Sequence, residues 1–132
     1  MTTMLFCEKC GIRYTRMNIH EAAKILSAGE ALPRCPECND ELIIKIRQQY
    51  PLERIAGVFH EYVVDRVSRA YSDEMAEQQN PPFDPMMFFI HESGTDKLFL
   101  WPIYWTKDEK GRWAWGQYSP MMTPDELQRL MR

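Results

Sequence analysis

The sequence has 132 residues, of which 45% are hydrophobic and 12% aromatic, so it can form one domain, or one domain with a small module, around a true hydrophobic core. The formal charge of -3 and the isoelectric point near 5.6 provide no global positive field that would attract nucleic acid. The opening MTTMLF lacks the basic and apolar segments of a signal peptide, and no stretch approaches the ~18 apolar residues of a membrane span. We therefore expect a cytoplasmic protein that keeps its thiols reduced and does not bind a membrane.

All four cysteines lie near the start of the chain, in two pairs with the spacing C-x-x-C. The stretch FCEKCG contains Cys7 and Cys10, and the stretch PRCPECN contains Cys35 and Cys38. A gap of two residues lets the chain turn so that both sulfurs of a pair face one point, and two such turns provide the four tetrahedral ligands of a zinc site. We therefore expect one structural Zn²⁺ ion, bound by these four cysteines.

Other uses of two C-x-x-C pairs stay open. An iron site of the rubredoxin type also takes two such pairs. A thioredoxin-like redox pair would begin a helix in a βαβ pattern, which neither pair does, and disulfides would need an oxidising compartment that nothing else indicates. Gly11 after the first pair and Asn39 after the second are the residue types that best tolerate a positive φ, which favours the turns of a metal site.

The segment between the two pairs predicts a short helix. Asn18 and Glu21 form a capping-box-like start, the helix extends to about Ser27, and Gly29 closes it. The stretches GIRYT and ELIIKI are typical of strands. Beside these strands, CEKCG and CPECN resemble the two knuckles of a zinc ribbon. The resemblance covers residues 4–47 and implies that the four cysteines are the ligands of a closed site, which stabilises the fold and performs no reaction.

The next thirty residues predict a long amphipathic helix over residues 51–79. Pro51 suits the first helical position, and apolar residues recur at steps of three and four. These residues are Leu52, Ile55, Ala56, Phe59, Val63, Val67, Ala70 and Tyr71. Asp65 and Arg69 have the i, i+4 spacing of an ion pair on such a helix, and NPPFDP would end it.

The last third of the chain predicts a three-stranded antiparallel meander. Its strands are expected at residues 86–92, 97–106 and 112–118, joined by SGTD and KDEKG. Thr123 and Pro124 begin a final helix over residues 124–131, with Glu126 completing a capping box. The expected fold class is therefore α+β, with a zinc-ribbon-like four-cysteine module at residues 1–47 and an α+β domain at residues 48–132.

Strand alternation assigns two faces to this meander. With these turn lengths, the expected cross-strand pairs are Ile90 with Phe99, Phe88 with Trp101, and Trp105 with Trp113. One face then holds nine large apolar side chains: Met86, Phe88, Ile90, Phe99, Trp101, Ile103, Trp105, Trp113 and Trp115. The opposite face is apolar as well, which is unusual for an antiparallel sheet, so either other elements cover both faces or part of the tryptophan face binds a partner.

We expect the tryptophans to supply a surface for a partner protein, because Trp anchors protein interfaces. The candidates are Trp101, Trp105, Trp113 and Trp115. Trp105 and Trp113 come first, since they flank the charged turn KDEKG, at an end of the sheet that a crossing helix covers least. The first functional hypothesis is a non-enzymatic adaptor or regulatory or inhibitory protein that acts by protein–protein interaction.

Two other functions remain as alternatives. Nucleic acid would bind the ribbon-like module if its basic side chains gather beside Tyr14, although six acidic residues share that segment. The basic residues are Arg13, Arg16, Lys24, Arg34, Lys45 and Arg47. An unrecognised enzyme is the second alternative. His20, His60 and His91 each precede a glutamate, but the second histidine of a metalloprotease helix is absent, and we predict no catalytic residue.

Overall fold

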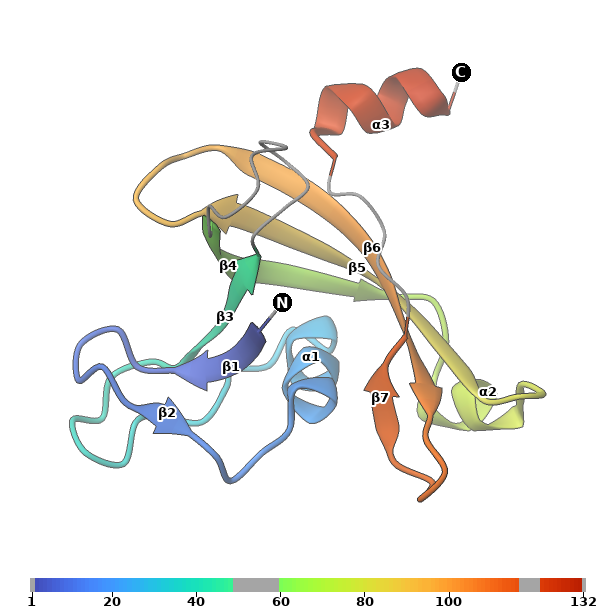
Figure 1. Ribbon diagram of the computed structural model, residues 1–132, viewed down its shortest axis with the longest axis horizontal. Helices are drawn as coiled ribbons and strands as arrows, with labels where there is room; N and C mark the ends of the chain where they lie inside the picture. Colours follow the sequence, from blue (N-terminus) through green and yellow to red (C-terminus); the bar gives the residue numbers. More distant parts are fainter. Residues whose placement is uncertain (1, 49–59, 117–121, 132) are drawn as a thin grey trace.

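The protein is built around a single antiparallel sheet. The computed structural model describes residues 2–48, 60–116 and 122–131, and seven strands in these segments pair in the order β2-β1-β3-β4-β5-β6-β7. The strands are β1 (Thr2–Phe6), β2 (Arg13–Tyr14), β3 (Ile43–Gln48), β4 (His60–Arg69), β5 (Phe83–Glu92), β6 (Leu98–Lys107) and β7 (Trp113–Trp115). The sheet curls into an open half-barrel (Figure 1).

Helices contribute little to this architecture. They are α1 (Ile19–Ser27), α2 (Asp73–Gln78) and α3 (Pro124–Leu130). The start of α1 is as predicted, because the Asn18 side chain accepts a hydrogen bond from the Glu21 backbone N–H at 2.8 Å, and Gly29 follows the helix with φ 75°. The protein is mainly β, and the α+β fold class expected from the sequence is wrong.

The long amphipathic helix expected at residues 51–79 is also wrong. Residues 60–69 form β4, a central strand that pairs with β3 on one side and β5 on the other. Within the described part of the expected helix, only α2 is helical, and Ser72 caps it. Residues 51–59 of that expectation lie outside the described residues.

A β-bulge explains the helical appearance of this strand. Tyr62 and Val64 are buried two residues apart, as alternation requires, but the register between β4 and β5 shifts between Val64 and Arg66. The extra residue puts the next buried side chain, Val67, three residues after Val64. Val63 is buried as well, so Val63 and Val67 have the four-residue spacing of the expected stripe. The β-branched and aromatic residues of the segment favour a strand, and this preference prevails over the apparent period. The expected Asp65–Arg69 ion pair does not form, since Asp65 instead contacts His91.

The hairpin of β5 and β6 has the predicted register. Ile90 pairs with Phe99 and Phe88 pairs with Trp101. The hairpin of β6 and β7 is displaced: Trp105 pairs with Trp115, while Trp113 pairs with Lys107.

The turn of the second hairpin explains this displacement. The Asp108 carboxylate accepts hydrogen bonds from the backbone N–H groups of Lys110 and Arg112, both at 2.9 Å. The turn therefore begins at Asp108 rather than Lys107. A shift of two residues along the strand leaves every side chain on its predicted face.

The predicted tryptophan face forms the core of the sheet. Phe88, Ile90 and Trp101 have no exposed surface, and α1 packs on the same core through Ala22 and Ala23, whose small side chains allow close approach. β3, which lies in the first expected domain except for its last residue, pairs with β4 of the second. The strands of both segments thus belong to one sheet, and the division of the chain after residue 47 stays a prediction.

Candidate metal centre

Two turns of the same construction carry the four cysteines. In the first, the Cys7 N–H donates to the Ile12 carbonyl at 3.0 Å and the Gly11 N–H donates to the Cys7 carbonyl at 2.7 Å. In the second, the Cys35 N–H donates to the Asp40 carbonyl and the Asn39 N–H donates to the Cys35 carbonyl, both at 2.8 Å. Each C-x-x-C pair therefore lies in a knuckle closed by two backbone hydrogen bonds at equivalent positions.

The residue after each pair has a left-handed backbone. Gly11 has φ 73° and Asn39 has φ 62°, and Asn39 is the only residue other than glycine with a positive φ among the described residues. Both conformations were expected from the residue types, since glycine and asparagine reach this region at the least cost. The tight return of the chain brings the two sulfurs of each pair to the same side of the turn.

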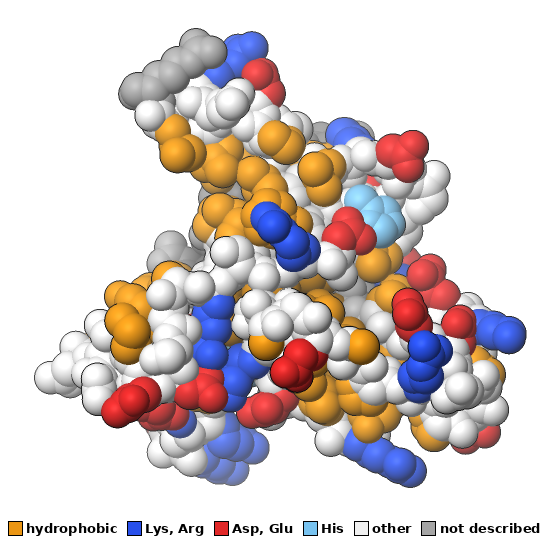
Figure 2. All heavy atoms as spheres, turned by 180° about the vertical axis from the view of Figure 1, so that it is seen from behind, with side chains coloured by type: hydrophobic (Ala, Val, Ile, Leu, Met, Phe, Trp, Pro, Cys, Tyr) orange, Lys and Arg blue, Asp and Glu red, His pale blue; other side chains and the backbone are white. Residues whose placement is uncertain are grey.

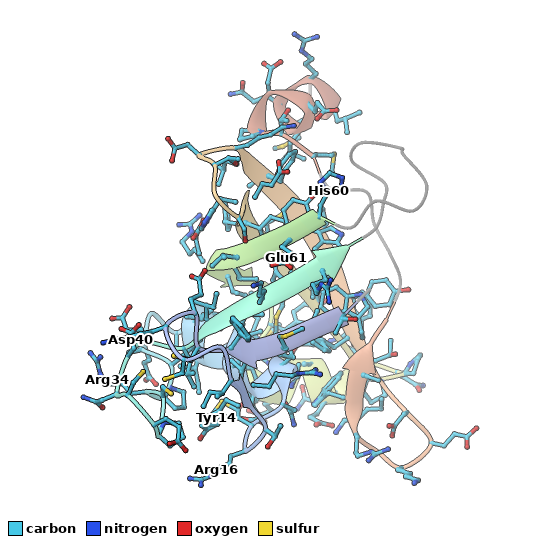
Figure 3. The ribbon with its side chains drawn as sticks, turned by 60° about the vertical axis from the view of Figure 1, so that its left-hand side comes forward. Tyr14, Arg16, Arg34, Asp40, His60 and Glu61 are labelled. Atoms are coloured by element: carbon cyan, nitrogen blue, oxygen red, sulfur yellow. The ribbon has the colours of Figure 1, made fainter. Side chains whose placement is uncertain are left out.

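The fold brings the two knuckles together at one end of the sheet. The first knuckle joins β1 to β2, and the second lies between Arg34 and Glu41, which form an isolated bridge, before β3 begins. β1 pairs with β3, so the two turns lie side by side. Figure 3 shows Arg34 and Asp40 at the end of the molecule that carries the knuckles, and Arg34 Nη1 donates to the Asn39 carbonyl at 3.0 Å.

The four sulfur atoms form one compact cluster. All of them lie within 4.8 Å of one another, and Cys7 Sγ is 3.5 Å from Cys38 Sγ. Four thiolates around a metal at ~2.3 Å would be about 3.8 Å apart, so the cluster has the dimensions of a tetrahedral site. Cys7 and Cys35 are buried against Leu42, whereas Cys10 is exposed. The four cysteines could therefore bind one metal ion at the molecular surface.

The electrostatics of the cluster favour a bound cation. The neighbouring thiol of Cys38, followed by burial, raises the pKa of Cys10 to about 12. Burial opposes ionisation of Cys35, but the backbone N–H groups of Cys38 and Glu37 lower its pKa to about 7. The shifts differ in sign because Cys35 accepts hydrogen bonds from backbone N–H groups and neighbouring thiols, whereas its neighbours and burial oppose ionisation of Cys10. Ionisation of all four thiols would therefore need a metal ion to compensate the charge.

The four tryptophans expected at a partner surface lie in the core or at its edge. Trp101 has no exposed surface and Trp105 is 4% exposed, and the Trp105 indole N–H donates to Met86 Sδ at 3.3 Å. Trp115 is half-buried, with its ring 5.3 Å from that of Trp101, and Trp113 is half-buried at the edge of the core. Trp101 and Trp105 are therefore core residues, and partner binding by Trp113 and Trp115 stays a prediction.

Each histidine bonds a carboxylate that is remote in sequence. The pairs are His20 Nε2 with Asp84 Oδ2 at 2.8 Å, His60 Nδ1 with Glu92 Oε1 at 3.4 Å, and His91 Nδ1 with Asp65 Oδ1 at 2.8 Å. In no pair is the partner the glutamate that directly follows that same histidine in the sequence. The sequence offered no signal for these pairs, because they form only when β4, β5 and α1 are assembled.

No protein-family model matches this chain, and no curated protein or solved structure matches it. Within the described residues, no helix is long and apolar enough to cross a membrane. Function must therefore be inferred from the residues of the chain itself.

Proposed function

We propose that the cysteine cluster is a zinc-ribbon-like site that binds one structural Zn²⁺ ion, and that the protein is a non-enzymatic adaptor or regulatory protein. The observation that carries this proposal is the closure of the cluster, in which Cys7, Cys10, Cys35 and Cys38 are mutual neighbours. Four thiolates saturate a tetrahedral ion and leave no position for water or substrate, as in structural zinc sites. Soft sulfur donors also disfavour Mg²⁺ and Ca²⁺. Thiolate ligands fit a reducing, cytoplasmic location.

The C-terminal helix supports interaction with a partner protein. α3 buries none of its residues, and Leu130 and Met131 are 72% and 76% exposed. A seven-residue helix gains most of its stability from packing an apolar face, and among the described strands α3 packs mainly against β6. Figure 2 shows hydrophobic side chains gathered beneath α3 and over the adjoining sheet. A partner that covers Leu130 and Met131 would complete the packing of this helix.

The nucleic-acid alternative gains no support from the basic side chains of the first segment. Lys24 forms an ion pair with Asp73 at 3.1 Å, and Lys45 forms one with Glu61 at 2.7 Å. Tyr14 is half-buried and packs against both hydrophobic clusters, so its ring is engaged within the fold. A stacking and phosphate-binding surface needs these groups free.

Affinity capture from a native extract tests the partner proposal. The wild type is compared with a double variant, Leu130→Ser with Met131→Ser, and with a matched control, Gln128→Ser with Arg129→Ser, on the same exposed helix. We expect one protein to be enriched by the wild type and the control and lost by the first variant. If the wild type enriches no protein, the interaction proposal is contradicted. If the variant with Leu130→Ser and Met131→Ser still captures the same protein as the wild type, the role of α3 is contradicted. Filter binding to nucleic acid should show no salt-dependent affinity.

A further inference from the structure

A cavity of about 490 Å³ lies between the start of α1 and the hairpin of β6 and β7. Asn18 and Glu21 line it from the helix, and Arg112 and Trp113 line it from the hairpin. His20 also lines this cavity, although its side chain is only 3% exposed, so the imidazole is a buried group at the base of a wider opening. The cavity shares no residue with the cysteine cluster.

The His20 ring is held rigidly in one orientation. It stacks on the Trp113 ring at 5.0 Å with an interplanar angle of 24°, and it meets the Trp105 ring edge at 5.1 Å and 72°. Nε2 lies 2.8 Å from Asp84 Oδ2, and Asp84 is completely buried. A ring fixed on three sides presents its remaining nitrogen in a constant direction.

The hydrogen bonds of Asp84 determine which ring nitrogen carries the proton. Arg69 donates to both carboxylate oxygens of Asp84, so this carboxylate is ionised and acts only as an acceptor. In a neutral imidazole, the proton must then sit on Nε2 and point to Asp84. Nδ1 keeps a lone pair, and no described residue donates a hydrogen bond to it. An acceptor without a protein partner, on a fixed side chain that lines a cavity, indicates a ligand that donates a hydrogen bond.

The carboxylates that line the cavity outnumber its lining cations by one, and the Lys107 ammonium lies 4.7 Å from the centre of the Trp113 ring. Glu21 and Asp108 contribute two carboxylates, and Arg112 contributes one guanidinium, which pairs with Asp108 at 3.3 Å. Glu21 keeps a side-chain exposure of 52% and only a long contact of 3.8 Å with Lys24. An anion would meet the lone pair of Nδ1 and these carboxylates, whereas an ammonium group would donate to Nδ1 with Glu21 nearby.

We propose that this cavity binds an ammonium group, which donates a hydrogen bond to His20 Nδ1 between Glu21 and Trp113. The group belongs either to a small free amine or to a lysine side chain of a polypeptide. This inference does not rest on the proposed function, because neither the zinc site nor α3 contributes to the cavity.

Ligand titration followed by long-range ¹H–¹⁵N NMR of the histidine rings tests this proposal. Three probes of equal chain length are used at pH 8, namely n-butylammonium, n-butanol and butyrate. We expect n-butylammonium alone to shift the His20 Nδ1 resonance with saturation, while His60 and His91 stay unchanged as internal controls. No saturable shift, or an equal shift with n-butanol or butyrate, would overturn the proposal.

Two variants make the test specific. In Asp84→Asn the side-chain oxygen must accept from Arg69, so the amide N–H₂ turns to His20 Nε2 and moves the ring proton to Nδ1. We expect this variant to lose n-butylammonium binding, whereas the matched change Asp65→Asn, which alters the His91 pair outside the cavity, should retain it. If Asp84→Asn does not fold, the affinity of Glu21→Gln for n-butylammonium is measured instead. We expect this affinity to fall about two- to fivefold, as for a partly exposed charge pair. Unchanged binding in a folded Asp84→Asn, or in Glu21→Gln, would contradict the site.

A separate arm distinguishes the two sources of the ammonium group. Nα-acetyl-lysine methylamide presents the same group on a blocked backbone. Binding as tight as that of n-butylammonium would identify a slot for a lysine side chain, and rejection of the lysine derivative would identify a site for small amines. Both outcomes require the same hydrogen bond to His20 Nδ1.

Discussion

Arg69 donates two hydrogen bonds to the buried carboxylate of Asp84, from Nε to Oδ1 at 3.0 Å and from Nη2 to Oδ2 at 2.9 Å. The two residues lie on neighbouring strands, β4 and β5, and Asp84 also bonds His20 of α1. One buried carboxylate thus joins three elements of the fold. Such a pair adds little net stability by itself, but the loss of one partner leaves a buried charge uncompensated.

We expect Arg69→Met to destabilise the protein by ~3–5 kcal/mol, because Asp84 would remain buried without its cation. Arg66→Met is the matched control, since Arg66 is exposed on the same strand and its guanidinium stacks on the Phe89 ring at 4.0 Å. The control should lose no more than about 1 kcal/mol. Urea denaturation of both variants measures the free energies of unfolding, and equal losses would contradict the role of Asp84.

The same carboxylate predicts a dependence of stability on acid pH. Burial opposes ionisation of Asp84, but hydrogen bonds from His20 and Arg69 lower its pKa below the ordinary value. A lowered folded-state pKa contributes stability that is present above the unfolded value of about 3.9 and is lost as pH falls through the folded value. Asp84→Asn lacks this titration, so the difference in melting temperature between wild type and variant should narrow between about pH 5 and pH 2. A difference that stays constant over this range would show that Asp84 does not titrate in this way.

Metal content tests the cysteine cluster directly. Metal analysis of purified protein should give one zinc per chain, and iron or well under one zinc would contradict the assignment. Cys35→Ser should release the metal and lower the melting temperature strongly, because a lost ligand removes most of the metal's contribution to folding. A chelator should do the same to the wild type. Equal melting temperatures for variant and wild type would exclude a structural role.

The cysteine cluster could be predicted from the sequence because its determinants are local. The C-x-x-C spacing and the residue after each pair, Gly11 or Asn39, specify each knuckle within six residues of sequence. Only the contact between the two knuckles depends on the rest of the fold. The hairpin of β5 and β6 was predictable for the same reason, since a short turn determines its register.

The errors arise where distant segments decide the outcome. β4 has its bulge because it pairs with β5, and the buried Val63 and Val67 therefore have a four-residue spacing that resembles a helix in the isolated sequence. His20 and Asp84 lie 64 residues apart, and neither residue has a local signal for the other. Trp105 was assigned to a surface because the turn beside it is charged, but α1 covers it through His20, whose ring lies 5.1 Å away.

Trp105 lies in the core and Trp113 at its edge, so truncation of the two side chains should cost different amounts of stability. Trp105→Ala should cost ~3–5 kcal/mol, the usual range for a large buried aromatic side chain. Trp113→Ala, at the edge of the core, should cost less while removing the ring on which His20 stacks. Thermal and urea denaturation measure both, and a Trp105→Ala variant as stable as the wild type would contradict its burial.

Gly116, directly after β7, lies so close to Tyr104 that a larger residue should clash there. A Cβ atom at this position would collide with the Tyr104 ring and lie 2.8 Å from the Tyr104 carbonyl oxygen, which belongs to the backbone and cannot move aside. The Gly116 N–H also donates to this carbonyl at 2.8 Å, so the close approach is part of the strand pairing. We expect Gly116→Ala to destabilise the protein by about 1–3 kcal/mol, as overpacking does.

Gly111 provides the matched comparison, because its requirement is conformational. It has φ 75°, and no heavy atom beyond its two chain neighbours lies within 4 Å of the position that an alanine Cβ would occupy, so Gly111→Ala should cost about 1–2 kcal/mol through the backbone alone. Asparagine tolerates this backbone better than alanine, so Gly111→Asn should recover part of the loss, while Gly116→Asn should recover none. Melting temperatures of the four variants decide between the two mechanisms, and recovery by asparagine at Gly116 would show that its role is conformational rather than steric.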